Sequence, residues 1–263
     1  MFRISNPLAG KSVVVTRAIG QADELISHLQ RLGAEVIHIP TIEIVPPDSW
    51  ADCDRALEKL HDYHWLIFTS TNGVRFFFRR LKDRGKKVDA LKKKQIAAVG
   101  ERTEEVLKEL GIQINLVPHD FSSEDLVEEF QKKDIVGLRI LLPKADKGRD
   151  VLKIGLTALG GKVDAVTVYK NQPTQRNNLS EYQKLLHGNA PDVLTFTSPS
   201  TLRNFISLFG AKRIYDWQTK GCRIAAIGKV TAEALEKHEL SADVFPDKST
   251  IPGLAVAIGD SYR

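Results

Sequence analysis

"IAAVGERTEEVLKE" runs from Ile96 to Glu109, and a close copy, "IAAIGKVTAEALEK", runs from Ile224 to Lys237. The two stretches are offset by 128 residues without a gap. Each begins with a short apolar run, passes through a glycine and continues with apolar residues at helical spacing. This pattern is typical of a strand followed by a helix. The chain therefore carries the same strand–helix unit twice.

The repetition extends over both halves of the chain. "FTS" at 68–70 returns at 196–198, again at an offset of 128. "LGAEV" at 32–36 returns as "LGGKV" at 159–163, at an offset of 127. Recurrence at one near-constant spacing indicates an internal duplication, and two copies are too few for a solenoid. The sequence predicts two similar domains.

Short apolar runs alternate with amphipathic helical patterns along the chain. The strand-like runs are "SVVVT", "AEVIHIP", "WLIFTS", "QIAAVG", "INLVP", "RILLP", "DAVTVY", "VLTFTS", "RIAAIG" and "DVFP". Apolar strands with intervening helices are typical of parallel sheets that helices cover on both faces. We predict an α/β protein with two doubly wound, flavodoxin-like domains of roughly five strands each. Two proline-bounded extended stretches, 38–47 and 166–174, interrupt the alternation and are predicted to be linker strands.

Composition narrows the class of protein. The chain has 263 residues, 42% hydrophobic and 27% charged, which is typical of a globular protein. The net charge is +5, but the lysine-rich run at 81–94 lacks interleaved aromatic residues, which disfavours nucleic-acid binding. Cys53 and Cys222 form no CxxC pair, so neither a disulfide framework nor a zinc site is expected. Without a signal peptide or membrane-spanning run, we expect a cytoplasmic protein that does not bind membranes.

Polar residues gather where the predicted strands end, which is where α/β sheets bind ligands. The hydroxyl, amide and glycine positions are Thr69, Ser70, Thr71, Asn72, Gly73, Thr103, Ser122, Thr197, Ser198, Ser200, Thr201 and Thr231. The cationic positions are Arg17, Lys144, Lys147 and Arg149. Each residue alone is explained by helix capping or a solvated loop. Together, at matching places in both halves, they predict a site for an anionic ligand, because helix N-termini attract anions.

The usual cofactor and metal motifs are missing. No GxGxxG follows a strand, and "AGKS" at 9–12 precedes a strand, unlike a phosphate-binding loop. His61 and His64 lack a third ligand, which favours a surface or capping role over metal binding. We expect an enzyme on this chain to need neither a cofactor nor a metal.

The chain resembles the uroporphyrinogen-III synthase family from end to end. The resemblance rests on the order and spacing of "PLAGKSVVVTRA", "LGAEVIHIPTIEI", "LIFTSTNGVRFF", "AAVGERTEEVLKELG", "ILLPKADKGRDVL", "ALGGKVDAVTVYKN", "PDVLTFTSPSTLRNF", "AAIGKVTAEAL" and "TIPGLAVAI". It implies an enzyme of tetrapyrrole biosynthesis that cyclises hydroxymethylbilane to uroporphyrinogen III. The reaction inverts the last pyrrole ring and releases water.

The resemblance also implies how the chain is divided. One domain would be discontinuous, comprising 1–38 and 172–263, and the other would be 46–165. The segments 39–45 and 166–171 would be linker strands, and the active site would lie between the domains.

Family members are usually assigned a tyrosine in the second linker strand as the proton donor, which implies Tyr169 in "TVYKN". The resemblance likewise implies that Thr103, Thr231, Ser70 and Ser198 bind substrate. A purely structural role for Tyr169, as an aromatic residue packed at a hinge, stays open at this stage.

Two other classes of function also stay open. One is a tetrapyrrole-binding or regulatory module without catalysis, and the other is a two-lobed solute-binding protein, which the missing signal peptide disfavours. The expected partner is a small tetrapyrrole substrate. We expect a monomer, and a transient contact with hydroxymethylbilane synthase is left open.

Overall fold

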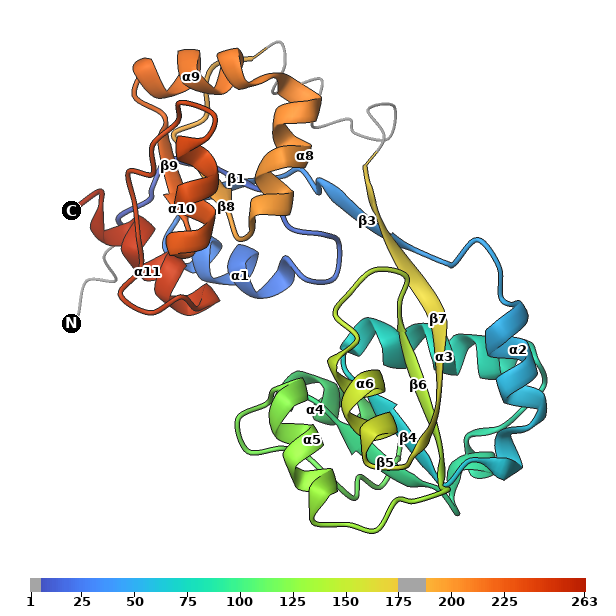
Figure 1. Cartoon of the computed structure of the whole chain (residues 1–263). Helices are drawn as coiled ribbons and strands as arrows, with labels where there is room; N and C mark the ends of the chain where they lie inside the picture. Colours follow the sequence, from blue (N-terminus) through green and yellow to red (C-terminus); the bar gives the residue numbers. More distant parts are fainter. Residues whose placement is uncertain (1–5, 175–187) are drawn as a thin grey trace, which may run out of the picture. The chain divides into compact units, whose positions relative to one another are not determined.

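The structure, a computed structural model, describes residues 6–174 and 188–263. It divides into two compact units. Unit 1 combines Met1–Glu43 with Gln172–Arg263, and unit 2 is Ile44–Asn171. The chain of unit 1 is thus interrupted by the whole of unit 2, as the colours in Figure 1 show.

Unit 1 is built on a four-stranded parallel sheet in the order β2-β1-β8-β9. Its strands are β1 (Ser12–Val15), β2 (Glu35–His38), β8 (Val193–Phe196) and β9 (Arg223–Ala226). Its helices are α1 (Asp23–Arg31), α8 (Pro199–Phe209), α9 (Ala211–Thr219), α10 (Lys229–Glu236) and α11 (Ile251–Asp260). All four residues of the central strand β8 are buried, as continuous apolar runs predict for a sheet covered on both faces.

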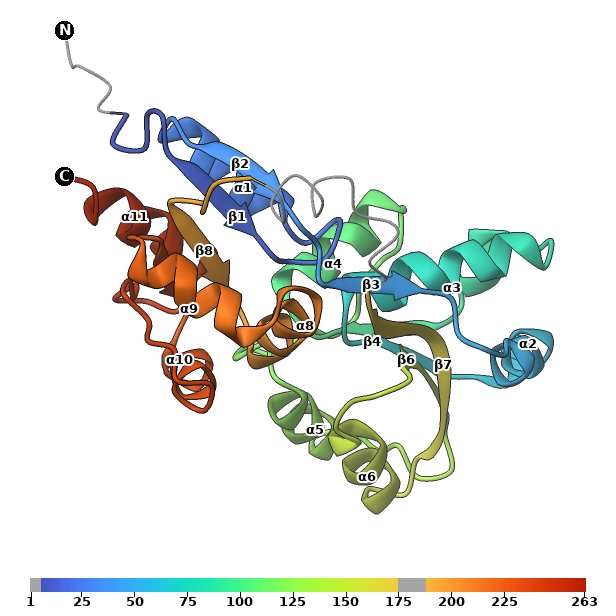
Figure 2. The same cartoon turned by 90° about the horizontal axis from the view of Figure 1, so that it is seen from above.

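Alternate side chains of the strands of unit 1 enter two separate cores. Val14 packs in a core with α8, α9 and α10, whereas its neighbours Val13 and Val15 pack with α1 and α11. Figure 2 shows these helices around the sheet. This alternation with a period of two residues is what a strand imposes, and it makes the sheet doubly wound.

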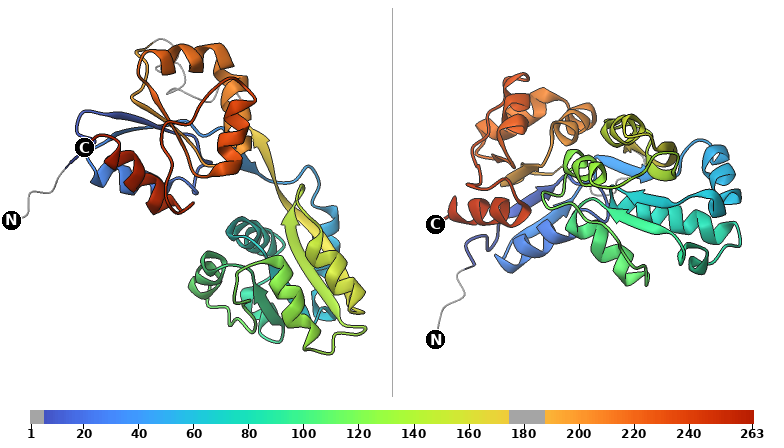
Figure 3. Two further views of the ribbon diagram at one scale, coloured as in Figure 1. Left: turned by 60° about the vertical axis from the view of Figure 1, so that its left-hand side comes forward. Right: turned by 60° about the horizontal axis from the view of Figure 1, so that its bottom comes forward.

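Unit 2 has a five-stranded sheet in the order β3-β7-β6-β4-β5, in which β4 pairs with β5 and β6, and β6 pairs with β7, in parallel. Its strands are β3 (Ile42–Val45), β4 (Trp65–Phe68), β5 (Gln95–Ala98), β6 (Arg139–Ala145) and β7 (Lys162–Pro173). Its helices are α2 (Ala51–Glu58), η1 (Leu60–Asp62), α3 (Thr71–Asp83), η2 (Val88–Leu91), α4 (Glu101–Glu109), α5 (Ser123–Gln131) and α6 (Val151–Ala158). One core holds residues of α2, α3 and α4, and the other holds residues of α5 and α6. Figure 3 shows the ribbon of the chain from two further sides. The predicted α/β class with two parallel-sheet units is confirmed.

Matching hydrogen bonds confirm that the two units repeat one design. The backbone N–H of Ile96 donates to Asn115 Oδ1 at 2.8 Å, and that of Ile224 donates to Asp243 Oδ2 at 2.8 Å. Both pairs are related by the 128-residue offset. The duplication therefore extends to individual side-chain contacts.

A second pair of matching side-chain hydrogen bonds lies beside a central strand of each sheet. His64, just before β4, accepts the backbone N–H of Arg139 through Nδ1 at 3.1 Å. Asp192, just before β8, accepts the backbone N–H of Ser12 through Oδ2 at 2.9 Å. His64 thus bonds to the backbone at the start of β6. The two units use different side chains, an imidazole and a carboxylate, for the same contact.

The repeated Leu-Gly pair ends a helix in each unit. The glycines after α1 and α6, Gly33 and Gly160, have φ of 92° and 86°. This left-handed backbone favours glycine, which lacks a Cβ. A Cβ at either position would also lie 3.0 Å from a neighbouring side chain. Helix termination explains why this dipeptide recurs.

The fifth predicted strand of each unit differs from expectation. "INLVP" and "DVFP" contribute only isolated parallel bridges, Ala97↔Leu116 and Ala225↔Val244. A proline, Pro118 or Pro246, follows two residues later and has no N–H to extend the ladder. The sheet of unit 1 accordingly has four strands in the described residues.

Both cysteines, Cys53 and Cys222, are unpaired and buried. Burial raises the pKa of each thiol to about 12, so neither is a reactive thiolate near neutral pH. Within 6–174 and 188–263, no group of three or more His, Cys, Asp and Glu side chains is arranged to hold a metal ion. No helix in this part of the chain has both the length and the apolar character to cross a membrane.

Candidate active site

A pocket of about 230 Å³ lies in unit 2, at the edge of the sheet where its parallel strands end. Six of its lining residues were predicted as site residues: Thr69, Ser70, Lys144, Lys147, Arg149 and Tyr169. They come from three parts of the chain, namely the end of β4, the end of β6 with the loop after it, and β7. The pocket therefore joins the predicted acid to predicted anion-binding residues.

Tyr169 lies on β7 with only 8% of its surface exposed. Its ring stacks on Phe76 of α3, with centroids 5.9 Å apart and an interplanar angle of 26°. Its hydroxyl oxygen is 3.1 Å from Ser70 Oγ. These two contacts hold both the plane of the ring and the position of the phenol oxygen.

A break in strand register places this tyrosine. Lys144 pairs with Thr167, but the next residue of β6, Ala145, pairs with Tyr169, so β7 holds one extra residue, Val168. Val168 and Tyr169 consequently enter the same core, which regular alternation would forbid. This bulge gives Tyr169 a different face from the one that an unbroken strand would give it.

Ser70 serves both the helix and the tyrosine. It follows β4 in extended backbone, with φ −160° and ψ 151°, and is the N-cap of α3. Its Oγ accepts the backbone N–H of Gly73 at 3.0 Å, which satisfies one of the free donors of the first turn. The capping role expected from sequence is thus combined with a contact to Tyr169.

The three cations of the pocket differ in their partners. Lys144 is paired with Asp150, and this hydrogen bond holds the pKa of the Asp150 carboxyl below its usual value. Arg149 Nη1 pairs with Glu124 Oε1 at 2.7 Å. Lys147 is exposed and has no ion-pair partner in 6–174 and 188–263. Lys147 is therefore the one of the three with its charge free for a ligand.

The other predicted residues of unit 2 lie outside the pocket. Thr71, Asn72 and Gly73 form the first turn of α3. Thr103 is buried in the first turn of α4, which begins after Gly100 without a cap from any described side chain. Ser122 caps α5 by accepting the backbone N–H of Asp125 at 3.0 Å.

In unit 1 the predicted hydroxyls form a capping network after β8. Ser198 caps α8 by accepting the N–H of Thr201 at 3.2 Å, and the Thr201 side chain accepts the N–H of Ser198 at 3.3 Å. Ser200 Oγ is 2.9 Å from Ser198 Oγ, and Thr197 precedes this network and is half-buried. Such reciprocal bonding is a capping box.

The remaining predictions in unit 1 are Arg17 and Thr231. Arg17 donates to the backbone oxygen of Gln21 at 2.9 Å, and burial lowers the pKa of its guanidinium. Thr231 is buried in the first turn of α10, which follows Gly228 and, like α4, is capped by no side chain in the part of the chain that the structure describes.

Comparison with known proteins identifies the family. A family model described as uroporphyrinogen-III synthase HemD matches residues 23–255. The chain is 34% identical over 257 residues to the uroporphyrinogen-III synthase of Synechococcus elongatus, covering 96% of each chain. It belongs to the uroporphyrinogen-III synthase family.

Further relatives of this synthase family agree over the whole length. The chain is 30% identical to the uroporphyrinogen-III synthase of Chlorobaculum parvum, covering 96% of this chain and 100% of that one. The crystal structure of uroporphyrinogen-III synthetase from Helicobacter pylori is similar with a TM-score of 0.63 and 18% identity, covering 96% and 99%. At that identity the structural likeness supports the fold.

Several lining residues of the pocket were missed by sequence reasoning. Ser123, Leu152 and Lys153 line it, and Phe76 supports Tyr169. Ser123 stands next to the predicted Ser122, so proximity to a helix start could have found it. Phe76 lies in the apolar "RFFF" run, where nothing in the sequence separates it from core residues.

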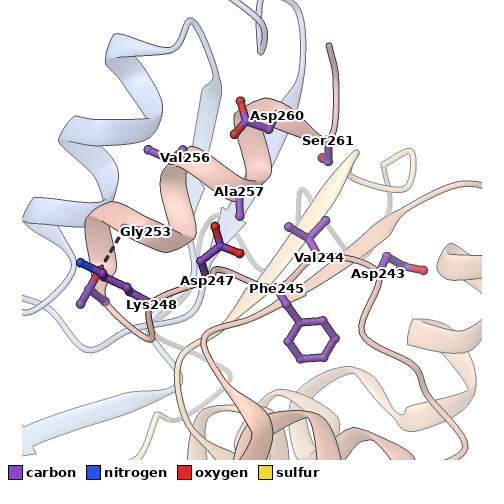
Figure 4. Close-up of a pocket in the computed structure, with 11 residues that line it drawn as sticks. Asp243, Val244, Phe245, Asp247, Lys248, Gly253, Val256, Ala257, Asp260 and Ser261 are labelled. Atoms are coloured by element: carbon purple, nitrogen blue, oxygen red, sulfur yellow. Dashed lines mark hydrogen bonds between the residues drawn. The ribbon is translucent and has the colours of Figure 1, made fainter.

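A larger pocket of about 580 Å³ lies in unit 1 beside α11 (Figure 4). Its polar lining includes Asp243, Asp247 and Lys248, and its apolar lining includes Phe245 and Val256. None of the predicted site residues lines it. Size alone does not connect it with the chemistry expected of a uroporphyrinogen-III synthase family member.

Proposed function

We propose that this protein cyclises hydroxymethylbilane to uroporphyrinogen III, with inversion of the terminal pyrrole ring and loss of water. Membership of the uroporphyrinogen-III synthase family supports the reaction. The observation that carries the assignment of the site is the pocket in which the Tyr169 phenol lies among Lys144, Lys147 and Arg149. This combination offers a proton donor next to groups that attract carboxylates.

Tyr169 is proposed to act when the terminal hydroxyl leaves. A phenol is protonated near neutral pH in its ordinary state and can donate to the departing hydroxyl. The pyrrole nitrogen supplies the electron pair that breaks the C–O bond, and the hydroxyl departs with the proton of Tyr169 as water. General acid catalysis of this kind contributes about 10²–10⁴-fold in rate.

Ring inversion follows from how the electrophile is attacked. The substituted α-carbon of the terminal pyrrole bonds to the new electrophilic carbon, which gives a spirocyclic intermediate. In this intermediate the original bond between that α-carbon and the methylene of the neighbouring pyrrole breaks, which makes the methylene electrophilic. The free α-carbon of the terminal pyrrole then bonds to the methylene, and the proton lost from this α-carbon restores the phenol. Atoms and charge balance, with water as the only other product.

The protein must hold the bilane folded, because free closure joins the ends without inversion. The acetate and propionate arms give the enzyme anionic handles. Lys147 and the N-terminus of α4, where none of the described side chains caps the helix, are proposed to bind these arms. Positioning of reacting groups can contribute several kcal/mol to the lowering of a barrier.

The test is the identity of the isomer formed. Purified protein is mixed with hydroxymethylbilane generated by its synthase, and the oxidised porphyrins are separated. Isomer III formed faster than the background appearance of isomer I supports the proposal. Isomer I alone, at the background rate, contradicts it, and tight tetrapyrrole binding without turnover would indicate a binding module.

We further propose that the protein is a cytoplasmic monomer that meets hydroxymethylbilane synthase only transiently. Gel filtration with light scattering tests the monomer. Competition by an added inactive synthase variant, which would lower isomer III formation from a coupled reaction, tests the contact.

A further inference from the structure

The duplicated serines after β4 and β8 have different partners. In unit 1, Ser198 Oγ accepts the N–H of Thr201 and contacts Ser200 Oγ at 2.9 Å. In unit 2, Ser70 Oγ accepts the N–H of Gly73 and contacts the Tyr169 hydroxyl at 3.1 Å. The capping bond is common to both units, and the second contact is what differs.

Gly73 accounts for this difference. It stands where unit 1 has Thr201, whose hydroxyl bonds to the backbone of Ser198 and closes the capping box. A Cβ at position 73 would lie 3.2 Å from Ser70 Oγ and 3.4 Å from the Pro143 carbonyl oxygen. Glycine therefore keeps other groups away from the Ser70 hydroxyl, while its backbone N–H still serves the cap.

We propose that Ser70 is a positioning residue for Tyr169. Ser70 Oγ accepts the Gly73 N–H, and of the two possible donors in its contact with the phenol oxygen we assign the Ser70 hydroxyl. The hydrogen of Tyr169 is then directed away from Ser70, toward a bound substrate. Phe76 fixes the plane of the ring, so Ser70 sets the remaining freedom, the rotation of the O–H bond.

The same hydrogen bond supports the transfer of the proton. As Tyr169 gives up its hydrogen to the leaving hydroxyl, negative charge develops on the phenol oxygen. A donor that already points at this oxygen stabilises the charge without rearrangement. Ser70 thus acts through Tyr169 and does not itself exchange a proton with substrate.

This inference rests on the proposed function, and a double-mutant cycle tests it separately. Ser70→Ala is expected to lower kcat about two- to tenfold, the range of one neutral hydrogen bond, and to change KM less. Ser70→Thr keeps both the hydroxyl and the helix cap, so its kcat is expected to match that of the wild-type protein and not that of Ser70→Ala. In the Tyr169→Phe background, Ser70→Ala lowers kcat no further, because the group that it positions is already gone.

The loss of a helix cap needs its own control. Thr250 caps α11 by accepting the N–H of Gly253 at 3.1 Å and has no aromatic partner among its hydrogen bonds in the described residues. Thr250→Ala is expected to lower the melting temperature about as much as Ser70→Ala, with kcat unchanged.

Three results overturn the inference. Multiplied losses in the double variant would show that Ser70 acts independently of Tyr169. A raised KM at unchanged kcat would make Ser70 a direct substrate ligand, and unchanged kcat and KM would leave it a cap only. Failure of the wild-type protein to form isomer III is a different result, which contradicts the proposed function instead.

Discussion

The strand end after β4 in unit 2 and the strand end after β8 in unit 1 descend from one duplicated segment. Ser70 and Ser198 both have extended backbone and both cap the following helix. One hydroxyl then meets Tyr169, and the other remains within a network of neighbouring hydroxyls. The two copies of a duplicated segment can thus keep the same helix cap and differ in the second contact of the capping hydroxyl.

The cores behind these strand ends have stayed alike. Phe68 and Phe77 meet edge-to-face with centroids 5.5 Å apart, and Phe196 and Phe205 meet in the same way at 5.5 Å. The two units thus share their core packing and differ in their polar contacts, so substitutions can test the two properties separately.

The largest expected effect tests the likeness of the cores. Phe77→Ala and Phe205→Ala should each cost about 3–5 kcal/mol of unfolding free energy, because each removes a fully buried ring. Denaturant unfolding with hydrogen exchange resolved by unit measures both losses. If one variant lost more than twice as much unfolding free energy as the other, the two cores would not be energetically alike.

Tyr169→Phe tests the difference between the strand ends. We expect kcat to fall about 10²-fold, the lower range for general acid catalysis, because the pyrrole nitrogen alone can still expel the hydroxyl. KM should change less, and the melting temperature should hold because the ring still stacks on Phe76. Full isomer III activity at an unchanged melting temperature would make Tyr169 a packing residue.

Gly73→Thr transfers the unit 1 pattern into unit 2. The new hydroxyl should close a capping box on Ser70 and draw it from Tyr169, which lowers kcat about two- to tenfold, as the loss of one hydrogen bond would. Steady-state kinetics measure this, and Gly73→Ala is the control for the added Cβ. Equal kinetics of the threonine and alanine variants would mean that steric displacement, and not competition for Ser70, causes any loss.

The smallest expected effect concerns Asp192, which makes in unit 1 the backbone contact that His64 makes in unit 2. Burial tends to raise the pKa of Asp192, but hydrogen bonds from Ser12 and Lys11 outweigh it, so the pKa lies below its usual value. The carboxylate therefore stabilises unit 1 at pH values above the unfolded-chain pKa of about 3.9. This stabilisation is lost as the pH falls through the lower pKa of the folded state.

We accordingly expect Asp192→Asn to cost about 1 kcal/mol at neutral pH and progressively less below about pH 4. Urea unfolding of both proteins at several pH values measures the difference. A cost that stays constant from pH 7 to pH 3 would mean that the charge of Asp192 contributes nothing.

The sequence predicted what depends on local pattern. The alternation of strands and helices and the serine caps follow from near neighbours in the chain, and each of these patterns occurs in both copies of the duplicated segment. The contact of Ser70 with Tyr169 could not be predicted in this way, because the two are 99 residues apart and the bulge at Val168 decides which face Tyr169 takes. The sequence also could not distinguish Lys147 from Lys144 and Arg149. The difference lies in the ion pairs that Lys144 and Arg149 form with acidic residues elsewhere in the fold.

The insertion of unit 2 into the chain of unit 1 has a consequence for the order of folding during synthesis. β1 pairs with β8, with Val13 opposite Val193, so it must wait for most of the chain to be made. Unit 2 is complete earlier, and within its sheet β3 is next to β7, where the Gln172 side chain donates to Glu43 at 3.3 Å. Once unit 2 folds, the two pieces of unit 1 are already joined at short range, and the entropy of closing a long loop need not be overcome again. A mutation in the core of unit 2 should therefore slow the folding of unit 1 as well, although it touches none of its residues.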